Sequence, residues 1–173
     1  MKYWQWLFKG LHGGPAGIKR FYNRWLVLHI SVGVLFAFLT PVPIFIAADS
    51  ILVPLAVILV GFIFIWTTTL QVLQSNKMAE LFKAHPHSYD KYVCVYQTAI
   101  LVFFVTLCAW IIGDLHIFDE VLGASFLCYL VKVALFFMSS VTVRECWHLV
   151  LSVAKLSLIN MKQDSELPDK HHE

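Results

Sequence analysis

The sequence predicts an all-α integral membrane protein, a four-helix bundle with both termini on the cytoplasmic side. Of its 173 residues, 59% are hydrophobic and 14% charged, whereas soluble domains contain about 25% charged residues. Four apolar windows, at residues 25–47, 51–70, 93–112 and 121–143, are each long enough to cross about 30 Å of hydrocarbon. Lys and Arg precede the first window, separate the second from the third and follow the fourth. By the positive-inside rule these segments are cytoplasmic.

Residues 1–24 are predicted to form an interfacial helix, a glycine-rich turn and the start of the first spanning helix. The interfacial helix is indicated by apolar residues at i, i+3, i+4 and i+7, which are Trp4, Leu7, Phe8 and Leu11. Glycines and a proline between residues 12 and 17 end it. A second helix is expected from about Ile18, entering the membrane at Trp25.

Prolines divide the predicted membrane domain, residues 25–143. Pro41 and Pro43 predict that the first helix ends or kinks near Leu39, because proline lacks an N–H donor and clashes with the preceding turn. Pro54 is expected in the first turn of the second helix, where proline is tolerated. The connection around Asp49 is therefore predicted to be a short, stiff outer hairpin.

The fourth helix is predicted to continue as a cytoplasmic helix over residues 144–161, followed by a disordered tail over 162–173. The helix is apolar on two sides, with Leu149 and Val153 opposite Trp147 and Leu151, and such a helix in the cytosol needs neighbours. We expect a partner-binding surface formed with the 75–92 connection. Its candidate residues are Trp147, His148, Val150, Leu151, Lys155, Leu158, Lys83, His85 and His87.

Lys132 is the only charged residue inside the four windows, and a lysine at the bilayer centre costs about 2.5–3.5 kcal/mol. It could line a cavity or pore that favours anions, bind an anionic lipid headgroup or partner, or snorkel to the surface. The predicted orientation places most polar side chains in the inner half of the bundle, with Lys132 at the border. The candidate residues of this layer are Lys132, His29, Gln97, Thr98, Thr68, Gln71, Ser139 and Ser140.

Two interpretations of the polar layer remain open. It could line a hydrated vestibule that opens to the cytoplasm. Alternatively, its Ser and Thr hydroxyls could bond their own helix backbone and join neighbouring helices.

Known catalytic motifs are missing from the sequence, which indicates a protein without enzymatic activity or cofactor. HExxH and GxSxG do not occur, and no acidic pair lies at the predicted membrane depth. His85, His87 and Asp90 are metal-ligand residue types, but zinc needs three or four ligands in fixed geometry, so a solvated loop is preferred and no metal site is predicted. Proton-coupled transport normally needs an intramembrane carboxylate, and the first window has His29 instead. The net charge of +2 gives no argument for nucleic-acid binding.

In its small outer loops, cytoplasmic termini and helical extension over residues 144–161, the chain resembles small four-span membrane subunits of bacterial antiphage defence systems, such as the Kiwa-type membrane component. The resemblance implies a membrane sensor that controls a cytosolic effector. We expect a non-enzymatic anchor or sensor in the inner (plasma) membrane. Its predicted partners are the lipid bilayer, further copies of itself and a cytosolic protein, without direct nucleic-acid contact. The alternative is an oligomeric pore or anion channel lined by Lys132.

Overall fold

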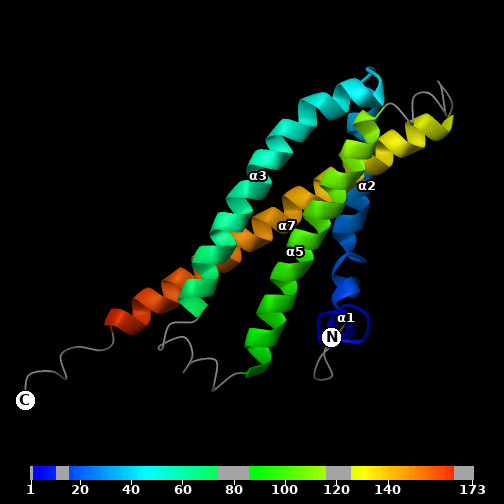
Figure 1. Ribbon diagram of the computed structural model, residues 1–173. Helices are drawn as coiled ribbons and strands as arrows, with labels where there is room; N and C mark the ends of the chain where they lie inside the picture. The colour runs from blue at the N-terminus through cyan, green and yellow to red at the C-terminus, as the bar shows by residue number, and fades with distance from the viewer. Residues whose placement is uncertain (1, 11–15, 74–85, 116–125, 166–173) are drawn as a thin grey trace, which may run out of the picture.

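The computed structural model describes residues 2–10, 16–73, 86–115 and 126–165, which contain helices and no strand (Figure 1). In chain order the elements are α1 (Lys2–Lys9), the 3-10 helix η1 (Gly17–Arg20), α2 (Arg24–Leu39), α3 (Ile44–Leu73), α5 (Pro86–Asp114) and α7 (Phe126–Ser165). The predicted all-α class is confirmed.

Three segments within these helices are long and apolar enough to cross a membrane: Ile44–Thr69, Val93–Asp114 and Phe126–Lys155. The fourth apolar helix, α2, has 16 residues, which correspond to about 24 Å at 1.5 Å per residue, less than the hydrocarbon thickness of about 30 Å. The described structure therefore supports membrane association through three long helices.

The break between α2 and α3 follows the prolines. The first helix ends at Leu39, as Pro41 and Pro43 predict, and its last turn is closed by Thr40 N–H donating to the Phe36 carbonyl at 3.0 Å. Because α3 begins at Ile44, residues 44–47 belong to α3 rather than to α2.

The prediction of a hairpin loop around Asp49 is wrong, because Asp49 lies inside α3. The proline pair ends the first helix earlier than the hydropathy window does, so residues 48–50 continue a helix already begun, and Ser50 Oγ donates to the Ile46 carbonyl at 3.2 Å. Pro54 consequently lies inside α3 rather than in a first turn. The helix is visibly bent towards its N-terminal end (Figure 1), as expected for an internal proline.

The N-terminal segment also differs from the prediction. Gly10 ends α1 with a φ of 80°, a left-handed conformation that glycine adopts without strain. No continuous helix starts at Ile18: η1 ends at Arg20, and α2 begins at Arg24. Asn23 sets that start, since its side-chain oxygen accepts a hydrogen bond from the Arg24 backbone N–H.

Trp6 anchors α1 to the rest of the protein. Its side chain is 4% exposed and packs on Gly17, where an added Cβ would lie 2.6 Å from the indole ring. Trp4 and Phe8 point outwards and stack on each other with ring centroids 6.2 Å apart. Trp4 and Phe8, on the outward face of α1, are therefore two of the four apolar positions that predicted this helix, whereas Trp6, which anchors it, is not one of them.

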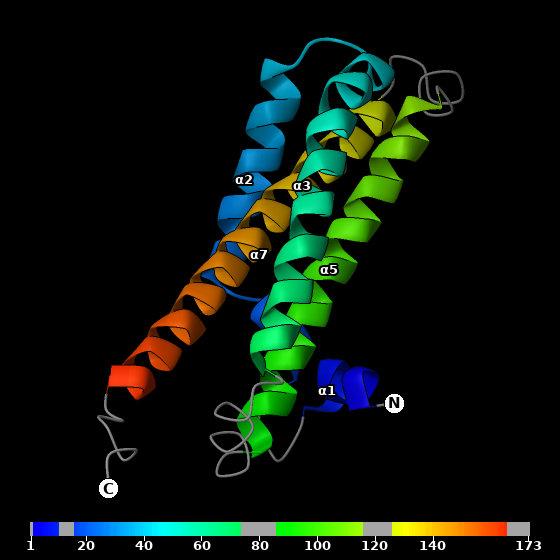
Figure 2. The same ribbon diagram turned by 60° about the vertical axis from the view of Figure 1, so that its left-hand side comes forward.

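The four apolar helices pack in the order α2, α7, α5, α3, because α7 contacts both α2 and α5, and α5 contacts α3. Figure 2 shows α7 crossing between its neighbours at an angle. Gly33 lets α2 approach α7 closely, since an added Cβ would lie 2.9 Å from the Val133 carbonyl oxygen. Trp110, Phe103 and Leu135 are among the buried core residues.

The fourth predicted helix is the longest element. α7 has 40 residues, which correspond to about 60 Å at 1.5 Å per residue. It runs unbroken past residue 143, and it includes residues 162–165, which were predicted to be disordered. Its C-terminal part diverges from α5 and α1 (Figures 1 and 2).

Candidate functional site

Lys132 lies in the second turn of α7 and joins it to the α2–α3 link. The side chain is buried, and Nζ donates to the carbonyl oxygens of Thr40 and Val42. These carbonyls follow the end of α2, where backbone acceptors lack helical partners and the helix dipole favours a cation. The ammonium group therefore caps α2.

The interpretation of Lys132 as the border of a polar inner half stays a prediction. The structure places Lys132 beside the connection between α2 and α3, because its Nζ contacts the carbonyl oxygens of Thr40 and Val42. The Lys132 side chain lies in the interior of the protein, where two carbonyls of its own chain accept hydrogen bonds from Nζ.

Most hydroxyl groups of the predicted polar layer bond their own helix. Each donates to the carbonyl four residues earlier, at distances between 2.7 and 3.0 Å. Thr68, Thr98 and Ser139 are candidates of the predicted layer, and Thr67, Thr69 and Thr142 of the same helices form the same kind of bond. Gln97 and Thr68 are exposed, and the Gln71 side chain lies outside the described part of the chain. These bonds favour the interpretation of helix-bonded hydroxyls over a hydrated vestibule.

Some of the same side chains also connect helices. His29 Nδ1 of α2 lies 2.7 Å from Ser140 Oγ of α7, and Trp110 Nε1 of α5 donates to Ser139 Oγ at 2.8 Å. The hydroxyls of Thr106 and Thr142 form a further contact of 2.8 Å between α5 and α7. These polar pairs fix the lateral positions of α2 and α5 against α7.

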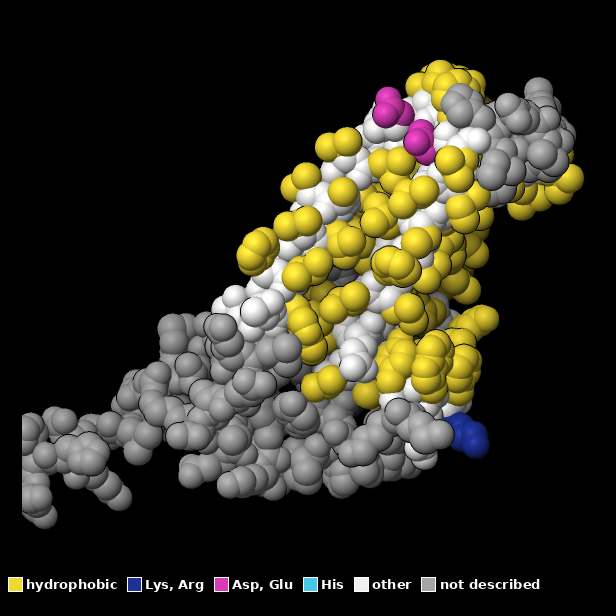
Figure 3. Space-filling view, viewed as in Figure 1, with side chains coloured by type: hydrophobic (Ala, Val, Ile, Leu, Met, Phe, Trp, Pro, Cys, Tyr) yellow, Lys and Arg dark blue, Asp and Glu magenta, His cyan; other side chains and the backbone are white. Residues whose placement is uncertain are grey.

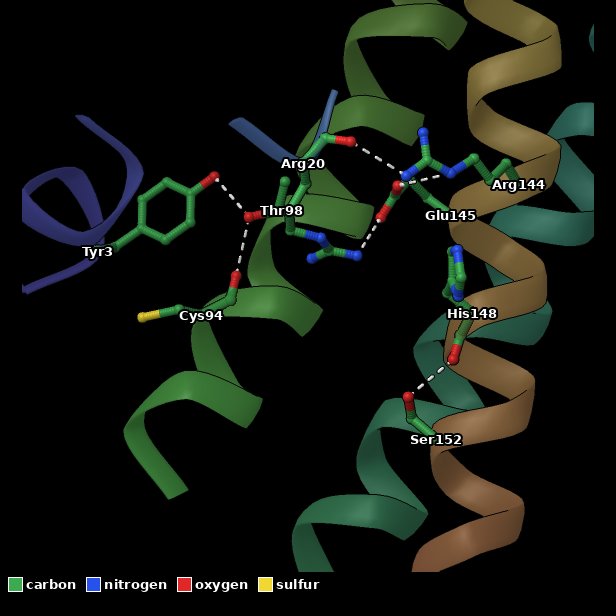
Figure 4. A network of polar contacts seen from close by, with 8 residues as sticks. All are labelled: Tyr3, Arg20, Cys94, Thr98, Arg144, Glu145, His148 and Ser152. Atoms are coloured by element: carbon green, nitrogen blue, oxygen red, sulfur yellow. Dashed lines mark hydrogen bonds and ion pairs between the residues drawn. The ribbon is translucent and has the colours of Figure 1, made fainter. Parts of the chain in front are cut away.

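A buried ion cluster ties the N-terminal segment to α7 (Figure 4). Glu145 is 1% exposed, and its Oε2 accepts a hydrogen bond from Arg20 Nη2 at 3.2 Å. Arg144 Nε lies 3.9 Å from Glu145 Oε1, while Arg144 Nη2 donates to the Arg20 carbonyl at 3.2 Å. A buried carboxylate is tolerated only with such compensation. Two guanidinium groups and one carboxylate leave the cluster with one net positive charge.

Sequence reasoning missed this cluster because the fourth hydropathy window ended at residue 143. The apolar segment of α7 continues to Lys155, so Glu145 lies inside a candidate span. The available signal was an Arg-Glu pair within an uninterrupted helical pattern of apolar residues.

Beyond Arg144, the described residues cover α7 on one side only. Leu149 is 3% exposed and Val153 packs against the core. The opposite side exposes four large apolar residues with His148 and Lys155 beside them. These four residues, which we call the α7 stripe, are Trp147, Val150, Leu151 and Leu158.

The remaining partner-binding candidates lie outside the described residues. Lys83 and His85 fall in residues 74–85, and the side chain of His87 is likewise not described. Within the described ranges, no group of three or more His, Cys, Asp or Glu side chains could hold a metal ion.

No protein-family model, curated protein or solved structure matches this chain. The resemblance to antiphage membrane subunits therefore remains a prediction.

Proposed function

We propose that this protein is a non-enzymatic membrane anchor or sensor subunit that recruits or regulates a soluble partner at the cytoplasmic surface. The observation that carries the proposal is the α7 stripe. The helix is fixed to the bundle on one side by Leu149 and Glu145, while Trp147 and Leu158 remain 62% and 57% exposed on the other.

The stripe has the chemistry of a helix that enters a partner's groove. Trp147, Leu151 and Leu158 repeat at i, i+4 and i+11, the spacing that presents apolar anchors on one helical face. Tryptophan is enriched among residues that dominate binding energy. Because buried side chains already hold α7 in place, its backbone would lose little conformational entropy when a partner binds.

Charge distribution supports the proposed orientation. Figure 3 shows acidic side chains near the end where α3 begins, Lys or Arg near α1, and hydrophobic side chains between them. Lys9, Lys19 and Arg24 are exposed at the N-terminal end, whereas Asp49 is exposed near the start of α3. The candidate span Phe126–Lys155 has 30 residues, more than the about 20 that cross the hydrocarbon, so its C-terminal part would extend beyond the bilayer. By the positive-inside rule, the N-terminal end and the α7 extension would face the cytoplasm, with α2 as a fourth, shorter span.

Oligomerisation, inner-membrane location and antiphage defence are further parts of the proposal. Self-association would bury exposed apolar surface, while a defence role is supported by architectural resemblance. The alternative of a pore lined by Lys132 has less support, because its ammonium group is engaged by two backbone carbonyls.

The test is purification of the tagged full-length protein in mild detergent, with native mass spectrometry of the complex. The wild type should retain a soluble protein at fixed stoichiometry, and the double variant Trp147→Ala, Leu151→Ala should lose it. Phe64→Ala is the matched control, because Phe64 is 69% exposed on α3. Absence of a stoichiometric partner, or equal retention by both variants, contradicts the proposal.

A further inference from the structure

An apolar groove runs between α2 and α5, with α7 as its floor. Its volume is about 530 Å³, within the range of pockets that bind small ligands. Leu26 lies on the α2 side, Leu101 and Val105 on the α5 side, and Met138 and Val141 on the floor. The groove is therefore suited to a hydrocarbon chain.

Arg144 also lines the groove and connects it to the ion cluster. With Arg20 and Glu145, this cluster carries one net positive charge. Among the described residues, Arg20 Nη1, Arg144 Nε and Glu145 Oε1 are buried and have no hydrogen-bond partner. Arg144 is the member of the cluster that lines the groove, and guanidinium donors are strong binders of carboxylate and phosphate. The apolar groove and the positively charged cluster therefore meet at Arg144.

We propose that the groove binds one anionic phospholipid, with an acyl chain between α2 and α5 and the phosphate near Arg144. The surroundings fit this occupant. Lys9 and Lys19 are exposed in the same N-terminal segment, and basic residues at a membrane surface attract anionic headgroups. The exposed Trp4 and Phe8 of α1 are typical of a helix that lies in the headgroup region.

The bound chain fills the space between two helices that are joined chiefly through α7. This inference is independent of the proposed soluble partner, because it requires only that the helices lie in a bilayer.

The test measures lipid binding to delipidated full-length protein by native mass spectrometry. Dioleoylphosphatidylglycerol should bind at least about fivefold more tightly than dioleoylphosphatidylcholine, the factor expected for one basic residue at an anionic headgroup. Val105→Trp should abolish this preference by filling the groove, and its half-exposed position leaves the core intact. Val57→Trp is the matched control, since Val57 is 66% exposed on α3.

A second variant pair tests the headgroup. Arg144→Gln should bring the two lipids to equal affinity, whereas Arg144→Lys should keep the preference for the anionic lipid. The proposal is overturned if wild-type protein binds both lipids equally, or if Val105→Trp retains the preference shown by Val57→Trp.

Discussion

Replacing Glu145 with glutamine tests whether the buried ion cluster holds the N-terminal segment on α7. The substitution keeps the side-chain volume and removes the charge that faces Arg20 at 3.2 Å and Arg144 at 3.9 Å. Removing one member of a fully buried ion pair costs about 3–5 kcal/mol. The side chains of Arg20 and Arg144 are 27% and 13% exposed, so both can regain some hydration. We expect Glu145→Gln to lower the free energy of unfolding by about 2–3 kcal/mol.

A double-mutant cycle separates the ion pair from other effects. Arg20→Gln leaves Glu145 beside Arg144, so its cost should be smaller, about 1–2 kcal/mol. The double variant should be more stable than the sum of the two losses predicts, with a coupling energy of about 1–2 kcal/mol. Asp49→Asn is the control, because this carboxylate is exposed on α3 and its replacement should stay within about 0.5 kcal/mol.

The measurement is reversible unfolding in mixed micelles with increasing dodecyl sulfate, followed by circular dichroism. The reasoning is refuted if Glu145→Gln unfolds at the same detergent fraction as Asp49→Asn and shows no coupling to Arg20→Gln.

Three further substitutions test other contacts. Lys132→Met leaves the Thr40 and Val42 carbonyls without their cation, so stability in the same assay should fall by about 1–3 kcal/mol; an unchanged midpoint would contradict the capping role. Gly33→Leu should cost about 1–3 kcal/mol or more by forcing α2 from α7, whereas Gly61→Leu should be tolerated because an added Cβ at Gly61 meets no atom within 4 Å. Gly17→Ala should displace Trp6 and accelerate limited proteolysis within α1 (Lys2–Lys9) without moving the global midpoint; wild-type proteolysis rates would refute this account of α1 docking.

Local chemistry explains which parts of the fold were predictable. Pro41 and Pro43 act on their own preceding turn, so the end of α2 at Leu39 could be predicted from the sequence. Hydropathy windows extend across such breaks, because apolar residues 44–47 score alike in either helix. The first window was therefore too long, and the loop expected around Asp49 is part of α3.

The contacts of the candidate site depend on tertiary structure. Lys132 is conspicuous in the sequence, but its acceptors are backbone carbonyls, which every residue carries and no pattern marks. Glu145 and Arg20 are 125 positions apart, so nothing local indicates their pairing. Hydroxyls such as that of Thr68 are equally compatible with a polar cavity and with bonds to the preceding helical turn.

The polar contacts converge on α7. Through Ser140 and Lys132 it holds α2 and the α2–α3 link, through Ser139 it holds α5, and through Glu145 it holds η1. The same helix forms the floor of the apolar groove and carries the exposed α7 stripe. Arg144 lies between these two surfaces along the helix and belongs to the ion cluster. A phospholipid at Arg144 and a protein on the stripe would therefore contact one continuous helix, held in position by side chains from three other elements.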